Sequence, residues 1–245
     1  MLGRLLSDQR YKDMHSNLKS IQAGQLRKKA LRDFEPPSPQ ETVNLLDHNA
    51  VVTVESLREL IIQELKDFQK AIDGGEFNSA AVFYDTIKSY DKKAKKHSKV
   101  FNRKSENEST ERIAERLNLR LQSQGILITP EHQLQALKRS DFTVTKMIGG
   151  VRRLLVTEVK GQWHDELYTA AVAQLHERYS IHPDAEQQGV YLVLWFGPEE
   201  KVAGLKKHQI ENAEALKKSI VAKMPPELAV LVDVFVLDVS TKQFN

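Results

Sequence analysis

The sequence predicts an α/β protein in which a helix, three strands, a helix and a strand follow one another, with a further helix and strand at the C-terminal end. Two observations support this prediction. The runs 154–160 and 189–196 are continuous and apolar, which is typical of strands covered on both faces. They alternate with segments whose apolar residues recur at helical spacing. We therefore expect a central sheet with helices packed on it.

Composition sets limits on the class of protein. The chain has 245 residues and 40% hydrophobic content, which is enough for a buried core. Its longest apolar runs are too short to cross a bilayer, and the N-terminus lacks the long apolar stretch of a signal peptide. We therefore expect a cytoplasmic protein without a membrane partner. The absence of cysteine excludes disulfides, thiolate metal sites and cysteine nucleophiles.

Two regions are predicted: a helical N-terminal region with a basic linker at 1–100, and a second domain at 101–245. Residues 1–35 carry apolar side chains at helical intervals, and three prolines at 36, 37 and 39 interrupt the pattern. This opening segment has too few large apolar residues to fold alone. We therefore expect it either to pack on the residues C-terminal to it or to be a remnant of a longer protein.

Two helices are predicted from capping boxes, in which a serine is followed three residues later by a glutamate. The boxes are Ser56 with Glu59 and Ser105 with Glu108. An apolar stripe follows each box, so helices are expected over 56–73 and 105–124. The first is expected to be a packing helix.

A basic run lies between these helices. From Lys88 to Lys104 there are eight lysines and arginines against the single acid Asp91. Such a run is most often a solvated face or a linker, and the alternative is contact with phosphates beside an active site. The lysines that we assign to nucleic-acid contact are Lys92, Lys93, Lys95, Lys96 and Lys99.

The remaining elements are predicted from apolar runs and turn residues. A short apolar piece at 125–128 precedes a short strand at 140–145 that begins with Asp141, and two glycines at 149 and 150 suit a hairpin turn. The elements expected after the turn are strand 154–160, helix 165–179, strand 189–196, helix 203–223 and strand 229–239.

Strand 154–160 ends in two opposite charges, Glu158 and Lys160. Side chains alternate along a strand, so both share a face with Leu154 and Val156. A buried carboxylate and ammonium are costly to desolvate unless they pair with each other or with a bound ion. Other acid–lysine pairs at this spacing do not end a hydrophobic strand. A functional site is therefore predicted here.

Oxygen ligands at this position suit a divalent cation. Magnesium binds through one or two carboxylates and keeps several waters. Asp141 and Glu158 are the expected principal ligands of Mg²⁺ or Mn²⁺, and the backbone carbonyl of Val159 is available as a third. Lys160 would orient or help deprotonate an attacking water and offset negative charge. Without the ion the two carboxylates repel each other, so at least one should resist ionising.

Asp141, followed seventeen residues later by Glu158-Val159-Lys160, resembles the motif of the PD-(D/E)xK nuclease superfamily, the restriction-endonuclease-like fold. The matching region runs from about 105 to 196. The segments 158–163 and 189–196 also look like a nuclease module found at the C-terminus of large bacterial proteins, often beside nucleotide-binding or defence modules. The resemblance implies a restriction-endonuclease-like core and metal-dependent cleavage of DNA by an endonuclease, in defence against foreign DNA.

The resemblance also implies roles for individual residues. Gln174 matches a polar position that many members use to hold the metal-bound water or a phosphate, and a buried glutamine bonded to backbone is an equal alternative. In members of this superfamily an acid on the first helix of the core, here the helix at 105–124, often adds a metal ligand. Glu111 is our choice, with Glu108 second and Glu115 third. The residue before Asp141 is serine, where proline is the nominal choice.

Two other functions stay open at this point. One is a catalytically silent nucleic-acid-binding or assembly module on the same fold, which would bind DNA without cutting it. The other is a structural salt bridge between Glu158 and Lys160 in an unrelated protein, which would bind no metal. No helix-turn-helix or finger motif is present to read bases. Any specificity is therefore expected from a partner protein or from a homo-oligomer.

Overall fold

A computed structural model describes residues 51–74, 77–91, 96–130, 140–148, 150–179 and 182–240, together with the isolated positions Ile21, Gln25, Lys28 and Arg32. The chain divides into two compact units, residues 1–51 and 52–245. In the first unit the four isolated positions are helical and exposed, and the rest of the helix expected at 1–35 lies outside the described residues. All elements discussed below belong to the second unit.

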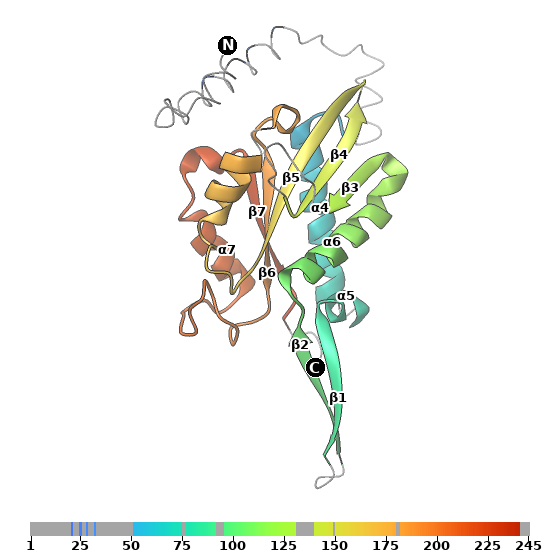
Figure 1. Cartoon of the computed structure of the whole chain (residues 1–245), viewed down its shortest axis with the longest axis vertical. Coiled ribbons are helices and arrows are strands. Elements are labelled where there is room, and N and C mark those ends of the chain that lie inside the picture. The colour runs from blue at the N-terminus through green and yellow to red at the C-terminus, as the bar shows by residue number, and fades with distance from the viewer. Residues whose placement is uncertain are drawn as a thin grey trace. The chain divides into compact units, whose positions relative to one another are not determined.

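A five-stranded mixed sheet forms the centre of the second unit (Figure 1). Its strands, in spatial order, are β3 (Ile126–Pro130), β4 (Phe142–Ile148), β5 (Val151–Gly161), β6 (Gly189–Trp195) and β7 (Val232–Asp238). Strand β4 pairs antiparallel with both β3 and β5, whereas β5, β6 and β7 run parallel to one another. Every residue of β6 is buried, as expected for a strand covered on both faces.

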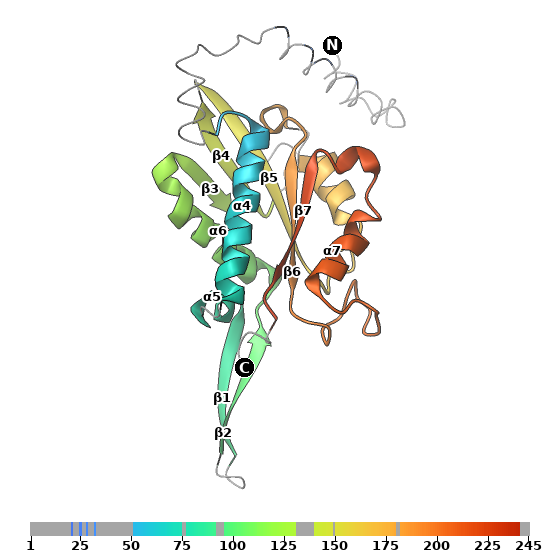
Figure 2. The ribbon, with the colours of Figure 1, turned by 180° about the vertical axis from the view of Figure 1, so that it is seen from behind.

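Helices cover both faces of this sheet (Figures 1 and 2). They are α4 (Val54–Asp73), α6 (Glu106–Leu121), the π-helix Ala171–Tyr179 and α7 (Ala213–Val221), and the short helix α5 (Phe77–Ala81) packs on α4. Helix α4 packs on β5 and β7, and α6 packs on β3 and β5. On the other face of the sheet, Leu154 and Val156 of β5 form a hydrophobic core with Leu175 of the π-helix and Leu216 of α7. No helix among the described residues is both long enough and apolar enough to span a membrane.

The expected domain boundary at residue 100 differs from the observed division of the chain. Helix α4 buries its apolar stripe against the sheet, with Leu57, Ile61 and Leu65 fully buried. It therefore belongs to the same unit as the strands that follow it, and the division lies between residues 51 and 52.

The capping residues were predicted correctly for one helix and displaced for the other. In α6 the Ser105 hydroxyl accepts the Glu108 N–H at 3.3 Å, and the Glu108 carboxylate accepts the Ser105 N–H at 3.0 Å. In α4 the cap is Thr53, whose hydroxyl accepts the Ser56 N–H at 3.0 Å. Ser56 is therefore the third helical residue, where it accepts the Thr53 N–H, and the helix begins two residues earlier than predicted.

The helix predicted over 203–223 is shorter than expected, because only Ala213–Val221 is helical. Asn212 caps it by accepting the N–H of Ala215 at 2.8 Å. The residues before the cap form a loop in which Gly204 has a φ of 76°, outside the right-handed helical region. The helix predicted over 165–179 likewise begins later, because turns occupy the residues before Ala170.

The region expected to be a basic linker contains a second, two-stranded sheet, which we call the ribbon. It consists of β1 (Tyr84–Asp91) and β2 (Lys96–Arg103), paired antiparallel with Tyr84 opposite Arg103. Both views show the ribbon extending away from the five-stranded sheet (Figures 1 and 2). The Tyr84 hydroxyl donates to the carbonyl of Val239 at 2.6 Å, which fixes the root of the ribbon just beyond β7.

Candidate active site

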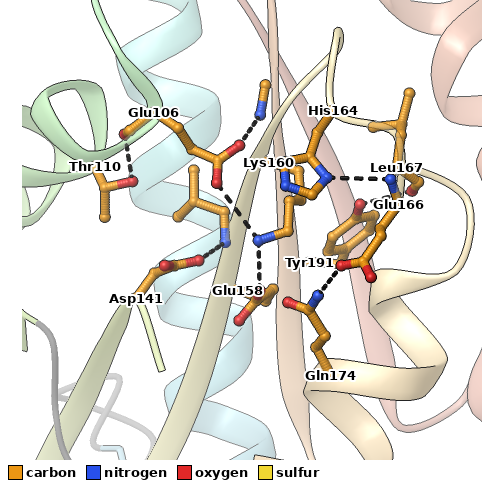
Figure 3. A network of polar contacts seen from close by, with 12 residues as sticks. Glu106, Thr110, Asp141, Glu158, Lys160, His164, Glu166, Leu167, Gln174 and Tyr191 are labelled. Atoms are coloured by element: carbon orange, nitrogen blue, oxygen red, sulfur yellow. Dashed lines mark hydrogen bonds and ion pairs between the residues drawn. The ribbon is translucent and has the colours of Figure 1, made fainter. Parts of the chain in front are cut away.

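The two acids predicted to share a cation come from neighbouring strands. Phe142 lies opposite Thr157 in the β4–β5 ladder, so Asp141, one residue earlier, comes opposite Glu158. Opposed residues of an antiparallel pair project to the same face, with Cα atoms about 4.5–5.5 Å apart. Asp141 Oδ2 accepts the N–H of Val159 at 2.6 Å (Figure 3). The structure therefore brings the two carboxylates to one edge of the site.

Lys160 links this pair of acids to helix α6. Its Nζ donates to Glu158 Oε1 at 2.7 Å and to Glu106 Oε1 at 3.5 Å (Figure 3). The other oxygen of Glu106 accepts the N–H of Gly161 at 2.8 Å. Glu158 and Lys160 are 2% and 5% exposed, so the pair is removed from water. One network therefore joins the C-terminal end of β5 to the first turn of α6.

Glu106 was not among the acids chosen from the sequence. It is the first residue of α6, directly after the Ser105 cap. Side chains on a helix lean toward its N-terminus, so an acid in the first turn reaches past the end of the helix. The capping box could have identified Glu106. It fixed the helix start at Ser105 and assigned Glu108 to the cap, which left Glu106 as the other acid of the first turn.

The environment of Glu158 makes this carboxyl harder to ionise than an exposed one. Burial is the largest cause and the charge of Asp141 is the next, and together they raise its pKa to about 8 against the opposing effect of Lys160. Its Oε2 atom is buried and has no hydrogen-bond partner among the described residues. This direction agrees with the expectation that one of two converging carboxylates resists ionisation, although burial contributes more than the charge of Asp141.

The environment of Lys160 favours its charged form. Burial alone lowers its pKa, but the charges of Glu158 and Glu106 outweigh burial and raise the pKa above the ordinary value. The side chain therefore stays an ammonium, which can donate hydrogen bonds and offset negative charge.

Tyr191 of β6 also belongs to this site, although nothing in its apolar run signalled a polar role. Its hydroxyl donates to the carbonyl of Leu167 at 2.6 Å and is fully buried. Burial raises its pKa first, and the charges of Glu158, Glu106 and Asp141 raise it further. All three acids thus act electrostatically on this one hydroxyl.

Gln174 lies on the π-helix, and its amide donates to the carboxylate of Glu166 (Figure 3). This partner is an exposed side chain, not the backbone group that the alternative interpretation proposed. Helices of the π type are uncommon and occur frequently at functional sites. The assignment of Gln174 to water or phosphate stays a prediction.

The three glutamates chosen on the first helix lie elsewhere on its surface. Glu111 is exposed, Glu108 caps the helix, and Glu115 accepts from Arg112 at 3.0 Å. The role of Glu111 as a metal ligand stays a prediction, and Glu106 is the acid of this helix that contacts Lys160.

The basic run is described in part. Lys92, Lys93 and Lys95 lie outside the described residues, Lys96 opens β2, and Lys99 is exposed on the same strand. Nucleic-acid contact by these lysines stays a prediction.

Trp163 closes one side of the site. A Cβ added to Gly161 would meet the indole ring, so the ring lies directly against that glycine. The indole also contacts the ring of Phe196 at a centroid distance of 5.4 Å, and the Arg103 guanidinium lies 3.5 Å from its centroid. Trp163 is therefore packed between the end of β5 and Arg103.

The donor set suits a hard cation. Within the described part of the chain, no group of three or more histidine or acidic side chains is arranged to hold a metal ion. Magnesium needs only one or two carboxylates, since it keeps several waters. The Oε2 atom of Glu158, opposite Asp141, supplies such an oxygen.

Comparisons with protein-family models, curated proteins and solved structures gave no match to this chain.

Proposed function

We propose that this chain is a divalent-metal-dependent endonuclease that hydrolyses phosphodiester bonds of DNA, in defence against foreign DNA. One observation carries the proposal. A buried lysine, Lys160, lies between Glu158 and Glu106 at the end of β5, where Glu158 stands opposite Asp141 and has a buried oxygen without a partner among the described residues. A buried lysine–carboxylate network is expensive to desolvate, and an unpartnered oxygen adds to this cost. Such an arrangement is better accounted for by a ligand than by stability.

The order of elements supports a restriction-endonuclease-like core. Helix α6 precedes the antiparallel strands β3, β4 and β5, and the π-helix leads from β5 to the parallel strand β6. This is the order that the resemblance to PD-(D/E)xK nucleases implies, with the motif acids on β5 and just before β4.

The proposed cofactor is Mg²⁺ or Mn²⁺, with Asp141 and Glu158 as ligands and the backbone carbonyl of Val159 as a third. When bound, the cation supplies a Lewis acid that polarises the scissile phosphate and activates water. It would also favour the ionised form of Glu158, whose raised pKa otherwise disfavours charge.

Lys160 has two tasks in this proposal. Its ammonium orients the attacking water, and it offsets charge that develops on the phosphate oxygens. Glu106 is a positioning residue, because it contacts Lys160 Nζ and the Gly161 N–H together and so fixes the end of β5 relative to α6.

Plasmid cleavage tests the proposal. Supercoiled DNA is incubated with the wild type, Lys160→Ala and Lys218→Ala, with and without Mg²⁺ or Mn²⁺. Lys218 is an exposed lysine of α7 and serves as the control. We expect metal-dependent nicking by the wild type and the control, and loss of nicking in Lys160→Ala. Equal activity in all three proteins would reject the assignment.

A second candidate is a catalytically silent nucleic-acid-binding or assembly module. The 2.7 Å bond between Lys160 and Glu158 favours it, because the pair already satisfies one carboxylate oxygen without a cation. Calorimetric titration with Mn²⁺ separates the two functions. Metal binding by the wild type that is lost in Glu158→Gln supports the nuclease, whereas DNA binding without metal binding or cut product supports the silent module.

Cleavage of both strands needs two active sites or a reorientation. We therefore propose that a homo-oligomer or a partner protein completes the enzyme and supplies its specificity. Sedimentation of the chain with and without duplex DNA would reveal a dimer.

A further inference from the structure

The ribbon has two chemically different faces. Opposed residues of an antiparallel pair share a face, and every second residue along each strand joins them. On one face Tyr84 pairs with Arg103, Thr86 with Phe101 and Lys88 with Lys99. The edge-to-face contact of Tyr84 with Phe101, at a centroid distance of 6.3 Å, agrees with this grouping. We call this side the basic face.

The other face of the ribbon carries little charge among its described side chains. Asp85 pairs with Asn102 there, and Ile87 with Val100. The apolar pair is 51% and 49% exposed, so neither residue contributes to a core. Asp85 accepts a hydrogen bond from Lys104 at 2.5 Å, and this ion pair balances the charge of the carboxylate. The two cations Lys88 and Lys99 thus face one side only.

The lysine pair is unfavourable within the ribbon itself. Lys88 and Lys99 are exposed and directly opposite each other, and like charges in that position destabilise a two-stranded sheet. The ion pairs described at the ribbon root, Arg103 with Glu200 and Lys104 with Asp85, involve neither lysine. A polyanion laid along this face would remove the repulsion.

The basic face is continuous with the candidate active site. Arg103, at the root of the ribbon, places its guanidinium over Trp163. That indole lies against Gly161, whose N–H is bonded to Glu106 beside Lys160. Lys99 lies four positions before Arg103 on β2, a distance of about 13 Å at a rise of about 3.3 Å per residue. This length corresponds to roughly four base pairs along one strand of duplex DNA.

We propose that the ribbon is an arm that enters the major groove of B-form DNA and directs the duplex toward the site at the end of β5. The major groove of DNA admits a two-stranded β-ribbon, whereas the major groove of an RNA duplex is too deep and narrow. Lys88 and Lys99 contact phosphates on the rim of the groove, and Arg103, held by Glu200 and Trp163, fixes the root. This inference rests on the proposed function and names double-stranded DNA as its substrate.

Equilibrium binding without divalent metal tests the arm separately from cleavage. The anisotropy of a fluorescein-labelled DNA duplex in EDTA is measured over a range of salt concentrations for the wild type and Lys88→Gln/Lys99→Gln. The control, Lys66→Gln/Lys218→Gln, removes the same charge from α4 and α7. All four lysines are exposed, and matched thermal unfolding curves verify that the variants are folded.

We expect the ribbon variant to bind the duplex roughly tenfold more weakly at low salt, with a log–log salt slope reduced by about 1.8, since each phosphate contact contributes about 0.9. The control should retain the wild-type slope. The inference is overturned if both double variants weaken equally, or if the ribbon variant retains the wild-type slope. It is also overturned if the loss is the same on single-stranded DNA or on an RNA duplex of the same sequence.

The outcome can be separated from that of the nuclease proposal. Metal-dependent nicking that is lost in Lys160→Ala, together with unchanged duplex binding by the ribbon variant, leaves the nuclease and rejects the arm. Weaker duplex binding by the ribbon variant, in a protein that cuts in no divalent metal, supports the arm and rejects the nuclease.

Discussion

The five-stranded sheet and the ribbon both carry lysines on strands, and they hold them in opposite ways. Lys160 of β5 is 5% exposed and contacts two carboxylates, whereas Lys88 and Lys99 of the ribbon are exposed and face each other. A buried charge is tolerated only with partners, and an exposed one needs none. The difference shows that Lys160 is held in place by its two carboxylate partners, whereas Lys88 and Lys99 are accessible to solvent.

The largest expected effect is on the rate at the buried lysine. Lys160→Met keeps most of the buried volume but removes the ammonium, so we expect the cleavage rate at saturating DNA and metal to fall by about a hundred-fold or more. Single-turnover kinetics measure the change. Lys66→Met on the exposed side of α4 is the control, and a decrease of similar size in that variant would contradict the special role of Lys160.

The same truncation should have unequal effects in the two sheets. Val156→Ala in β5 removes a fully buried side chain, so it should lower the free energy of unfolding by about 2 kcal/mol, from lost burial and a cavity. Val100→Ala in the ribbon removes a side chain that is 49% exposed and should change stability by less than about 0.5 kcal/mol. Urea unfolding measures both. Equal losses would mean that the ribbon is as tightly packed as the core.

Gly161, at the end of β5, lies against the Trp163 ring, and Arg103 of the ribbon lies over the same ring. Gly161→Ala places a Cβ against the Trp163 indole, so the ring must move. We expect a stability loss of about 1–3 kcal/mol and an altered near-ultraviolet circular dichroism spectrum. The loss should vanish when Gly161→Ala is made in a Trp163→Ala background, as a double-mutant cycle would report. A loss that persists in that background would place the clash elsewhere.

The last prediction concerns how the free energy of unfolding changes with pH. The folded pKa of Glu158 is raised to about 8 from an ordinary value of 4.5, so between these pH values the folded chain keeps a proton that the unfolded chain has released. The stability contributed by this group is complete below pH 4.5 and is lost as the pH rises through 8. Glu158→Gln should remove this dependence, which is at most about 1.4 kcal/mol per pH unit. Thermal unfolding in EDTA measures it, with exposed Glu227→Gln as the control, and parallel curves for Glu158→Gln and the wild type would contradict it.

Much of the sheet could be predicted from the sequence, because local signals and burial agree there. The glycines at 149 and 150 marked a hairpin turn, and Ile148 does lie opposite Val151 across it. Runs of apolar residues located β5 and β6, and the capping box at Ser105 located α6. The charges at the end of β5 could also be predicted to share a face, since alternation alone decides it.

Tertiary contacts decided what the sequence did not reveal. The ribbon was hidden because its strands have charged and polar residues where a buried strand has apolar ones, and cross-strand pairing alone defines it. Glu106 was missed because its partners, Lys160 and Gly161, lie more than fifty residues away. Tyr191 was hidden in an apolar run, where only the fold brings Leu167 and the acids to its hydroxyl.

The position of the β4–β5 turn determines which residues of the two strands lie opposite each other at the proposed cation site. Ile148 and Val151 flank the turn, and counting seven residues back from Ile148 and seven forward from Val151 reaches Asp141 and Glu158. Because the side-chain period of a strand is two, a shift of one residue in β4 or in β5 would send one carboxylate to the opposite face of the sheet. Two equal spans of backbone therefore set the pairing of the acids, and lengthening one strand by a single residue should separate them while leaving both in the chain.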